Sequence, residues 1–307
     1  MKNKIVVIGS SNVDLIMKMD HLPQKGETVT DAVFMQVYGG KGANQAVAAA
    51  RASGNVTFIS CVGEDAYTPQ MLKNYENDGI DTRFVFQEKN VASGHALIMI
   101  DKNGNNIISV APGANDLLLP EKIDLAEKIL DEAAIIVMQF EIPEITIKHV
   151  IDIANKKHIP VMWNVAPAKS FDFSLIHKIN ILILNEIEAG FLSGITVNSE
   201  TDAEKAAQKL VKEGVEKVII TLGAKGAFIV TKTEKISVPS FKVDAIDTTA
   251  AGDTFCGTFA VALVENKSLK NALQFANAAA AISVTRMGAQ PSAPVRKEID
   301  SFIIERN

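Results

Sequence analysis

Cysteine and aromatic residues are scarce in this sequence. Its 307 residues include only 2 cysteines, and aromatic residues make up 6% of the chain. Cys61 and Cys256 lie far apart and form no CxxC pair, which excludes a disulfide scaffold and suits a reducing compartment. We therefore expect a cytoplasmic protein. Hydrophobic residues make up 47%, which excludes intrinsic disorder and leaves enough apolar surface for a large core.

Long apolar runs and an excess of positive charge are also missing. No apolar run approaches the ~20 residues that a bilayer-spanning helix needs. The 31 basic and 36 acidic residues give a net charge of −5, and no long run of lysine or arginine occurs. Because nucleic-acid-binding proteins usually carry a basic patch or stripe, we expect neither a nucleic-acid nor a membrane partner.

Several common catalytic signatures do not occur. The chain has no Gly-Lys-Ser/Thr of a Walker A loop and no GxGxxG of a dinucleotide-binding fold. Its five histidines show no HExxH or zinc-like spacing, and no GxSxG nucleophile elbow is present. P-loop NTPases, nicotinamide-dependent oxidoreductases, zinc enzymes and serine hydrolases are therefore disfavoured. His95 on a predicted strand is interpreted as a packed or surface residue.

What the sequence does contain is an alternation of short β-branched runs with longer amphipathic stretches. The runs indicate strands at residues 4–8, 56–61, 134–139, 161–163, 181–184 and 217–222. Helical spacing marks residues 44–53, 145–157 and 202–213, followed by C-terminal helices at 252–265, 269–286 and 295–305. This order predicts an α/β fold with a mostly parallel sheet that helices cover on both faces.

A small β layer interrupts this alternation. Residues 13–19, 28–38 and 93–110 alternate like half-exposed strands, with a turn at 101–104. No linker or repeat divides the chain. We therefore predict a single domain over residues 1–307, with a discontinuous β layer from about 13–38 and 92–112.

Polar residues follow each predicted strand of the main sheet. In an open parallel sheet, ligands bind at the carboxyl ends of the strands. The residues at these ends are Asn12, Asp14, Glu64, Asp65, Glu141, Asn164, Asn185, Glu188 and the glycine-containing segment 223–226. Helix capping explains any one of these loops equally well. Together they favour a polyol, a metal ion or both as ligand.

Two further segments carry chemistry. Residues 39–44 (GGKGAN) place three glycines before an alanine-rich helix, so that the backbone can approach a ligand while Lys41 and Asn44 offer polar groups to hydroxyls. Residues 247–253 (DTTAAGD) lead into an apolar helix, where bare main-chain N–H groups would form an anion hole. Asp253 would accept a proton there, although it would also serve as an ordinary helix N-cap.

Taken together, these segments closely resemble signatures of the ribokinase-like (PfkB-type) carbohydrate kinases. The match runs essentially end to end, from residues 9–14 (GSSNVD) to 288–292 (GAQPS), and stretches 38–49 and 247–255 are highly specific as a pair. The resemblance implies a three-layer ribokinase-like α/β fold with a small β-sheet lid. It also implies ATP-dependent phosphorylation of D-ribose at its 5-hydroxyl, giving D-ribose 5-phosphate.

The resemblance also implies roles for individual residues. Asp253 would be the general base, and Ala250, Ala251 and Gly252 would form the anion hole. The sugar hydroxyls would be held by Asn12, Asp14, Gly40, Lys41, Asn44, Glu141 and Asp253. The nucleotide site would be lined by Asn185, Thr221, Gly223, Ala224, Gly226, Gly252 and Asn277.

Two metal ions follow from the same resemblance. Asn185 and Glu188 form an Asn-x-x-Glu pattern that would place Mg²⁺ through water, as suits an ion that sheds its hydration reluctantly. A potassium site would be formed largely by backbone carbonyls of Asp247, Thr249, Ser283, Arg286, Gly288 and Ser292. Such an ion would act as an activator by shaping the anion-hole loop from outside the reaction.

Some features depart from the family pattern or go beyond it. Thr258 stands where the family usually has Ala or Gly, and Ser283 stands where some members have Ala; neither touches the proposed chemistry. Family members pair two subunits through the lid strands, so we expect a homodimer, in keeping with strand edges that need covering.

Alternative functions stay open at this point. The same kinase site would suit 2-deoxyribose, another pentose or a nucleoside, and sequence does not give the geometry that decides between them. A non-catalytic sugar-binding protein on the same fold is a remote alternative, since the base and the anion hole are both present. A dinucleotide-binding oxidoreductase is more remote still, because its glycine fingerprint is missing.

Overall fold

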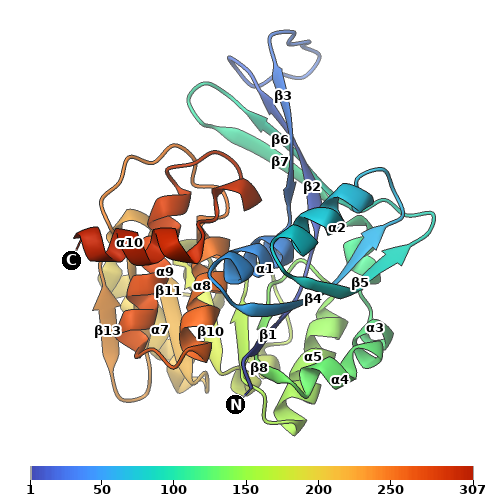
Figure 1. Cartoon of the computed structure of the whole chain (residues 1–307). Coiled ribbons are helices and arrows are strands. Elements are labelled where there is room, and N and C mark those ends of the chain that lie inside the picture. Colours follow the sequence, from blue (N-terminus) through green and yellow to red (C-terminus); the bar gives the residue numbers. More distant parts are fainter. Residues whose placement is uncertain (1, 307) are drawn as a thin grey trace.

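The computed structural model describes residues 2–306, and its centre is a large twisted sheet (Figure 1). The sheet has 9 strands in the order β13-β12-β11-β10-β9-β8-β1-β4-β5. All neighbours pair in parallel except β11 with β12 and β12 with β13. The strands are β1 (Lys4–Ile8), β4 (Asn55–Gly63), β5 (Asp81–Glu88), β8 (Ala133–Met138), β9 (Val161–Asn164), β10 (Ile181–Asn185), β11 (Lys217–Thr221), β12 (Ala227–Val230) and β13 (Lys235–Val238).

Helices cover both faces of this sheet, which makes three layers (Figure 1). One face packs against α1 (Lys41–Arg51), α2 (Thr68–Asn77), α8 (Ala251–Val264), α9 (Leu269–Ser283) and α10 (Arg296–Arg306). The other packs against α3 (Pro120–Leu125), α4 (Glu127–Leu130), α5 (Glu144–Lys156), α6 (Glu186–Ser193) and α7 (Glu200–Lys212). Successive residues of β1 point to opposite cores: Val6 to the second and Val7 to the first. Burial on both faces explains why the strands are continuously apolar.

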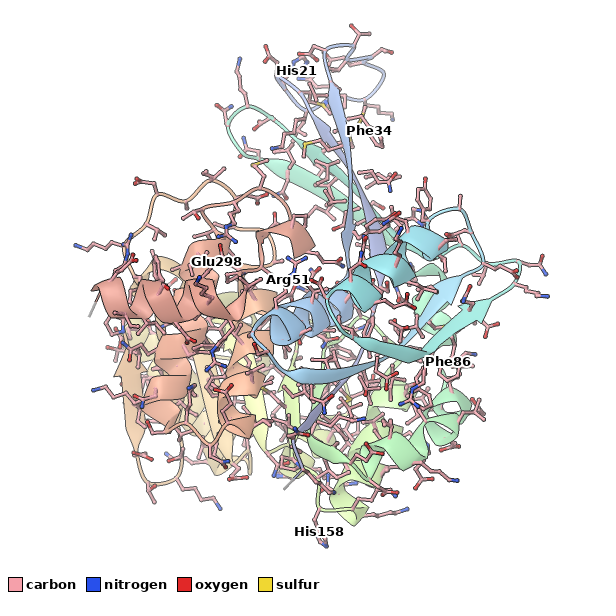
Figure 2. All side chains as sticks on the ribbon, in the orientation of Figure 1. His21, Phe34, Arg51, Phe86, His158 and Glu298 are labelled. Atoms are coloured by element: carbon pink, nitrogen blue, oxygen red, sulfur yellow. The ribbon has the colours of Figure 1, made fainter. Side chains whose placement is uncertain are left out.

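A second sheet projects from the main body (Figure 1). It has 4 strands in the order β3 (Val33–Gly39), β2 (Asn12–Lys18), β6 (Gly94–Ile100) and β7 (Asn106–Ala111). Strand β2 begins four residues after β1 ends, so its first residues stay at the carboxyl edge of the large sheet. Phe34, labelled in Figure 2, lies on the projecting part of β3 and is 58% exposed.

Helices α1 and α8 lie directly against each other, and a glycine makes this possible. A Cβ added at Gly257 of α8 would collide with the backbone carbonyl oxygen of Gln45 on α1. The two helix axes therefore approach more closely than any side chain at this position allows. Because both helices begin at the same edge of the sheet, this contact brings their N-terminal turns together.

The predicted fold class is confirmed, and the differences are local. Strand β3 begins at Val33 rather than at residue 28, and α1 begins at Lys41 rather than at residue 44. Strands β5, β12 and β13 and helices α2, α3, α4 and α6 were not predicted, since each is short or weakly periodic. Within residues 2–306, every helix is too short or too polar to cross a bilayer.

Candidate active site

Asp253 lies in the first turn of α8, where its buried carboxylate is held by two amides. Its Oδ2 accepts a hydrogen bond from Asn44 Nδ2 at 3.0 Å, and its Oδ1 accepts one from Gln45 Nε2 at 3.0 Å. Both donors come from the N-terminal part of α1. The N-cap of α8 is Ala250, in the left-handed conformation with φ 57°. The alternative interpretation of Asp253 as a helix N-cap is therefore wrong, because the residue stands three positions further on.

The N-terminus of α8 is open. Ala251 N–H donates to the Thr248 carbonyl at 3.3 Å, whereas Gly252 N–H and Asp253 N–H have no hydrogen-bond partner among residues 2–306. A Cβ built on Gly252 would find no heavy atom within 4 Å. Unpaired N–H groups at the positive end of a helix attract anions. The geometry therefore suits a phosphate group, as expected for the predicted anion hole.

Several predicted sugar ligands surround Asp253. Glu141 Oε2 accepts a hydrogen bond from Lys41 N–H at 3.0 Å and one from Ser10 Oγ at 2.6 Å. Gly40, whose φ of 88° favours glycine, turns the chain into α1 at this point. The Asn44 side chain turns its Nδ2 to Asp253, and its buried Oδ1 has no partner among the described residues. Such an acceptor is available to a hydroxyl.

Asn12 and Asp14 enter the site from β2. Asn12 is buried, and its Oδ1 accepts a hydrogen bond from Asn115 Nδ2 at 2.7 Å. The NH₂ group of the Asn12 side chain is therefore the part that can donate to a ligand. Burial, reinforced by the charges of Glu141 and Asp253, raises the pKa of Asp14 from 3.8 to about 7, and Lys41 opposes the rise.

Lys41 is the cation among these carboxylates. The Asp253 carboxylate raises the pKa of Lys41 against the opposing effect of burial, and Glu141 adds to the rise. Lys41 is therefore charged at neutral pH. One ammonium thus faces four carboxyl groups, those of Asp14, Glu141, Glu188 and Asp253. A polyol whose hydroxyls donate to them would satisfy acceptors that the protein leaves free.

Two cavities meet at the start of α8. The larger, of about 630 Å³, is lined by all of the predicted nucleotide residues, namely Asn185, Thr221, Gly223, Ala224, Gly226, Gly252 and Asn277. The smaller, of about 210 Å³, is lined by Lys41, Asn164, Glu188 and Asp253 among others. Asn185, Thr221 and Gly252 line both. A nucleotide-sized space therefore opens onto the carboxylate of Asp253 across the N-terminus of α8.

The predicted magnesium residues form a capping box at the N-terminus of α6. Asn185 Oδ1 accepts from Glu188 N–H at 2.8 Å, and Glu188 Oε2 accepts from Asn185 N–H at 2.9 Å. Burial raises the pKa of Glu188, although the hydrogen bond from Asn185 and the charge of Lys41 oppose this. Glu188 Oε2 thus caps the N-terminus of α6, and the Glu188 side chain also lines the smaller cavity.

The predicted potassium residues lie at the end of α9 and on two loops that Asp247 joins. Its Oδ1 accepts from Thr249 N–H at 2.9 Å, and its Oδ2 accepts from Gly288 N–H at 2.9 Å. Although burial acts in the opposite direction, these hydrogen bonds hold the pKa of Asp247 below its ordinary value. The Ser292 hydroxyl donates to the Ala289 carbonyl at 2.7 Å and Ser283 Oγ donates to the Ala280 carbonyl at 2.9 Å, which fixes where each hydroxyl hydrogen points.

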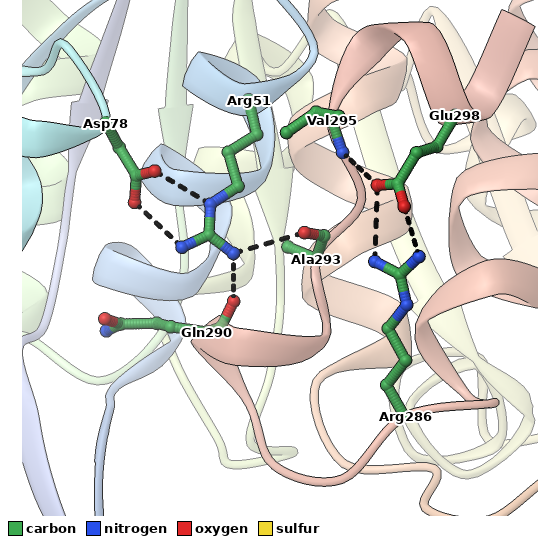
Figure 3. Close-up of polar contacts among 7 residues, drawn as sticks. All are labelled: Arg51, Asp78, Arg286, Gln290, Ala293, Val295 and Glu298. Atoms are coloured by element: carbon green, nitrogen blue, oxygen red, sulfur yellow. Dashed lines mark hydrogen bonds and ion pairs between the residues drawn. The ribbon is translucent and has the colours of Figure 1, made fainter.

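The second of these loops is fastened to α1 (Figure 3). Arg51 makes a two-pronged ion pair with Asp78, at 2.8 and 3.1 Å, and its Nη1 also donates to the carbonyls of Gln290 and Ala293. The Arg286 guanidinium instead pairs with Glu298 at 2.5 Å. The side chain of Arg286 therefore stabilises the start of α10, and only its main chain is free for the role that was predicted.

Comparison with known proteins gives the family. Residues 2–296 match the model of the pfkB family carbohydrate kinases. The ribokinase of Haemophilus influenzae is 41% identical, and the match covers 99% of both chains. The deoxyribokinase of Salmonella typhi is 38% identical, and the match covers 97% of this chain and 98% of that protein. The chain belongs to the pfkB family of carbohydrate kinases.

Solved structures agree with this assignment. The ribokinase of Thermotoga maritima is 42% identical and superposes with a TM-score of 0.89 over 98% of this chain and 99% of that one. The Arabidopsis thaliana ribokinase, whose structure contains ribose and ATP, is 34% identical with a TM-score of 0.92 over 99% of both chains. The chain is thus a carbohydrate kinase with the three-layer fold of ribokinases, as predicted.

Sequence reasoning missed residues that hold this kinase site together. Gln45 contacts Asp253, Ser10 contacts Glu141, and Asn115 contacts Asn12. Gln45 stands inside the glycine-containing motif, so its position was a signal, whereas nothing local marks Asn115. Conversely, Asp65 lies apart from the site: it accepts hydrogen bonds from Tyr67, Thr68 and Ser93 backbone N–H groups and stabilises a loop.

We expect Asp14→Asn to stabilise the free kinase at high pH. The folded-state pKa of Asp14 is raised, so the folded protein binds the proton more tightly and loses stability as the pH rises from about 4 to about 7. The variant lacks this loss, and its free energy of unfolding should exceed that of the wild type by about 2–4 kcal/mol at pH 8. Urea unfolding at pH 8 and pH 4.5 measures the difference, which should shrink to about 1 kcal/mol at pH 4.5. An equal difference at both pH values would contradict the assignment.

Proposed function

We propose that the protein transfers the γ-phosphoryl group of ATP to the 5-hydroxyl of D-ribose, giving D-ribose 5-phosphate and ADP. The observation that carries this proposal is the placement of a buried carboxylate beside an open helix N-terminus where two cavities meet. Asp253 takes the proton of the 5-hydroxyl as its oxygen attacks the γ-phosphorus. The bond between that phosphorus and the bridging oxygen of ADP breaks, and the segment Ala250–Gly252 stabilises the charge on the transferring group.

The sugar would bind under the small sheet. Asp14 and Glu141 offer carboxylate oxygens, Lys41 and Asn12 offer N–H donors, and Asn44 offers the buried Oδ1 that has no partner among the described residues. Gly40 keeps the loop close to the ligand. We further propose that residues 1–307 act as one domain, in which strands β2, β3, β6 and β7 form the lid of the sugar site.

The nucleotide would occupy the larger cavity, with Asn277 beside its adenosine part. Asn277 Nδ2 also donates to the Val238 carbonyl at 3.0 Å, which fixes the wall of the cavity. Mg²⁺ fits between the two cavities, where Glu188 offers a buried carboxylate. Burial raises the pKa of Glu188, and a bound cation would favour its ionised form. Asn185 and Glu188 would hold the ion through water, and bound Mg²⁺ neutralises phosphate charge.

A potassium ion fits the two loops that Asp247 joins. The donor set is oxygen only, as such a hard cation prefers, and the ionised Asp247 supplies a negative charge. The main-chain carbonyls of Asp247, Thr249, Ser283, Arg286, Gly288 and Ser292 would be the principal ligands. Since residues 247–249 lead directly into the anion hole, an ion here would stabilise its shape.

A substrate panel tests the function. We expect a coupled ADP-release assay to give the highest kcat/KM with D-ribose and a rate that rises when potassium replaces sodium.

Asp253→Asn should lower kcat by at least about 1,000-fold while the ribose Kd changes less than about five-fold, because the base is lost but the hydroxyl contacts remain. Near-normal turnover of that variant would refute the proposed mechanism.

The second candidate is phosphorylation of 2-deoxyribose. The Salmonella deoxyribokinase is nearly as similar in sequence as the Haemophilus ribokinase. In the panel above, a higher kcat/KM for 2-deoxyribose than for ribose would favour it and would leave the roles of Asp253 and the anion hole unchanged. Nucleosides and other pentoses are included in the same panel.

Gly252→Val tests the anion hole without disturbing the fold. The new Cβ would project into the space shared by the two cavities, where it has no heavy atom of another segment within 4 Å. We expect kcat/KM for ATP to fall by at least about 100-fold. The melting temperature should stay within a few degrees of the wild-type value. Gly252→Ala should show a smaller loss, and full activity of the valine variant would contradict the assignment.

We also propose a homodimer that forms through the small sheet. Its apolar side chains are unusually exposed, at between 49% and 62%, for Val33, Phe34, Leu97, Ile107, Ile108 and Val110. By strand register, Phe34, Leu97 and Ile107 share one face of the sheet, and the other three share the opposite face. Exposed apolar side chains on one face of a sheet mark an interface, and a second copy would cover the face of Phe34 symmetrically.

The dimer is tested by charge substitution. We expect Phe34→Glu with Leu97→Glu to sediment as a monomer, because two buried carboxylates at such an interface oppose association. Ile304→Glu on α10, where the side chain is 78% exposed, is the matched control and should remain dimeric. A wild-type protein that sediments as a monomer at micromolar concentration would refute this proposal.

A further inference from the structure

A chain of buried amides contacts Asp253 through the carboxylate oxygen that Asn44 does not bind. Gln45 is fully buried, and its Nε2 donates both to Asp253 Oδ1 at 3.0 Å and to Asn164 Oδ1 at 3.2 Å. Its Oε1 accepts a hydrogen bond from Gln139 Nε2 at 2.7 Å. The amides come from α1, from the end of β9 and from the residue that follows β8. Three separate segments therefore meet at Gln45, and Gln45 alone of the three contacts the Asp253 carboxylate.

The directions of the hydrogen bonds in this chain are determined from two sides, by the Asp253 carboxylate and by the Ile183 carbonyl. An ionised carboxylate only accepts, so Gln45 must present its NH₂ group to Asp253 and its carbonyl oxygen to Gln139. Gln139 must then present its own NH₂ group to Gln45. At the other side, Asn164 Nδ2 donates to the Ile183 carbonyl at 3.0 Å, so Asn164 turns its oxygen to Gln45.

This arrangement has a cost that a purely structural network would avoid. Gln139 Oε1, at the end of the chain, is buried and has no partner among the described residues. An unsatisfied buried acceptor is unfavourable, and turning the amides round would satisfy it only by placing the Gln45 oxygen against Asp253 Oδ1 and Asn164 Oδ1. The network is therefore polarised toward an ionised carboxylate at the position of Asp253.

We propose that Gln45 is a positioning residue for phosphoryl transfer: it fixes Asp253 Oδ1, and thereby turns Oδ2 toward the smaller cavity as the proton acceptor. Gln139 and Asn164 hold Gln45 in turn. Gln45 itself lies behind the carboxylate and touches neither cavity. The inference rests on the proposed function of Asp253 as the base and adds the group that orients it.

Other charged and titratable groups also face Asp253, and each must be kept constant in a test. Lys41 faces it from α1, Glu188 from α6 and Asp14 from β2, and the buried thiol of Cys256 lies one turn further along α8. Substitutions at Gln45 and Gln139 leave all four in place. A change in the pH dependence of turnover would then report the loss of the amide donor.

The experiment compares Gln45→Met with the double variant Gln45→Met, Gln139→Met. Both remove the donor to Asp253 Oδ1, and the double variant also removes the amide that would otherwise face an apolar side chain. We expect kcat to fall by about 10- to 100-fold and the acidic limb of the kcat profile to move up by about one to two pH units, because the ionised carboxylate loses a hydrogen bond. KM for ATP should change less than about two-fold. Thr146→Val, which removes a buried hydrogen bond to the Leu118 carbonyl outside the site, is the matched control.

The outcomes separate this inference from the proposed function. A double variant that folds, by circular dichroism, and keeps the wild-type pH profile would overturn the positioning role, whatever its rate. A profile that moves in Thr146→Val as much as in the Gln45 variants would overturn it as well. The failure of the base assignment is recognised independently, by turnover in Asp253→Asn. Loss of turnover there, together with an unmoved profile in the Gln45 variants, would reject the present inference alone.

Discussion

The site depends on the packing of α1 against α8. Gly257 lets α8 approach the backbone of α1 at Gln45, and this contact places Asn44 and Gln45 within hydrogen-bond distance of Asp253. A carboxylate this deeply buried is costly unless donors hold it. The two amides from one helix supply those donors to the first turn of the other. The position of the Asp253 carboxylate thus depends on a single helix–helix contact.

The electrostatics of the sugar side have a different origin. Asp14, Glu141 and Asp253 come from three elements and share the one ammonium of Lys41, so the free site holds more negative charge than it neutralises. The pKa of Asp14 near 7 reflects this imbalance together with burial. Hydroxyl donors favour the ionised form of a carboxyl group, so a bound polyol would lower that pKa and release a proton at neutral pH. The uncompensated carboxylates of the free enzyme therefore favour a ligand with many hydroxyl donors.

The sequence was sufficient for the layers and for the loops at the strand ends, but not for the contacts between distant elements. Continuous apolar strands and amphipathic helices predict the parallel sheet, and the two glycine-containing motifs single out Lys41 and Asp253 from local pattern alone. Gln139, Asn115 and Arg51 contact partners that lie 94, 103 and up to 242 positions away, and no local pattern records such pairings. Short elements such as β13, with 4 residues, were missed because they carry too little periodicity. The polar residues at Asp65 show the reverse error, since a loop-stabilising carboxylate has the same local signature as a ligand.

The segment after α9 explains how distant parts of this site can act together. Its Gly288 N–H donates to Asp247, shortly before the anion-hole segment. Gln290 Nε2 donates to the carbonyl of Gly39, the first residue of the glycine-containing segment 39–44. Arg51 fastens the same segment to the end of α1, whose beginning carries Lys41 and Asn44. One short stretch of chain is therefore bonded to the loop before α8, to the loop before α1 and to α1 itself. A cation held by its carbonyls would stiffen all three connections at once, so an ion that touches neither substrate would act on both of them through main-chain geometry.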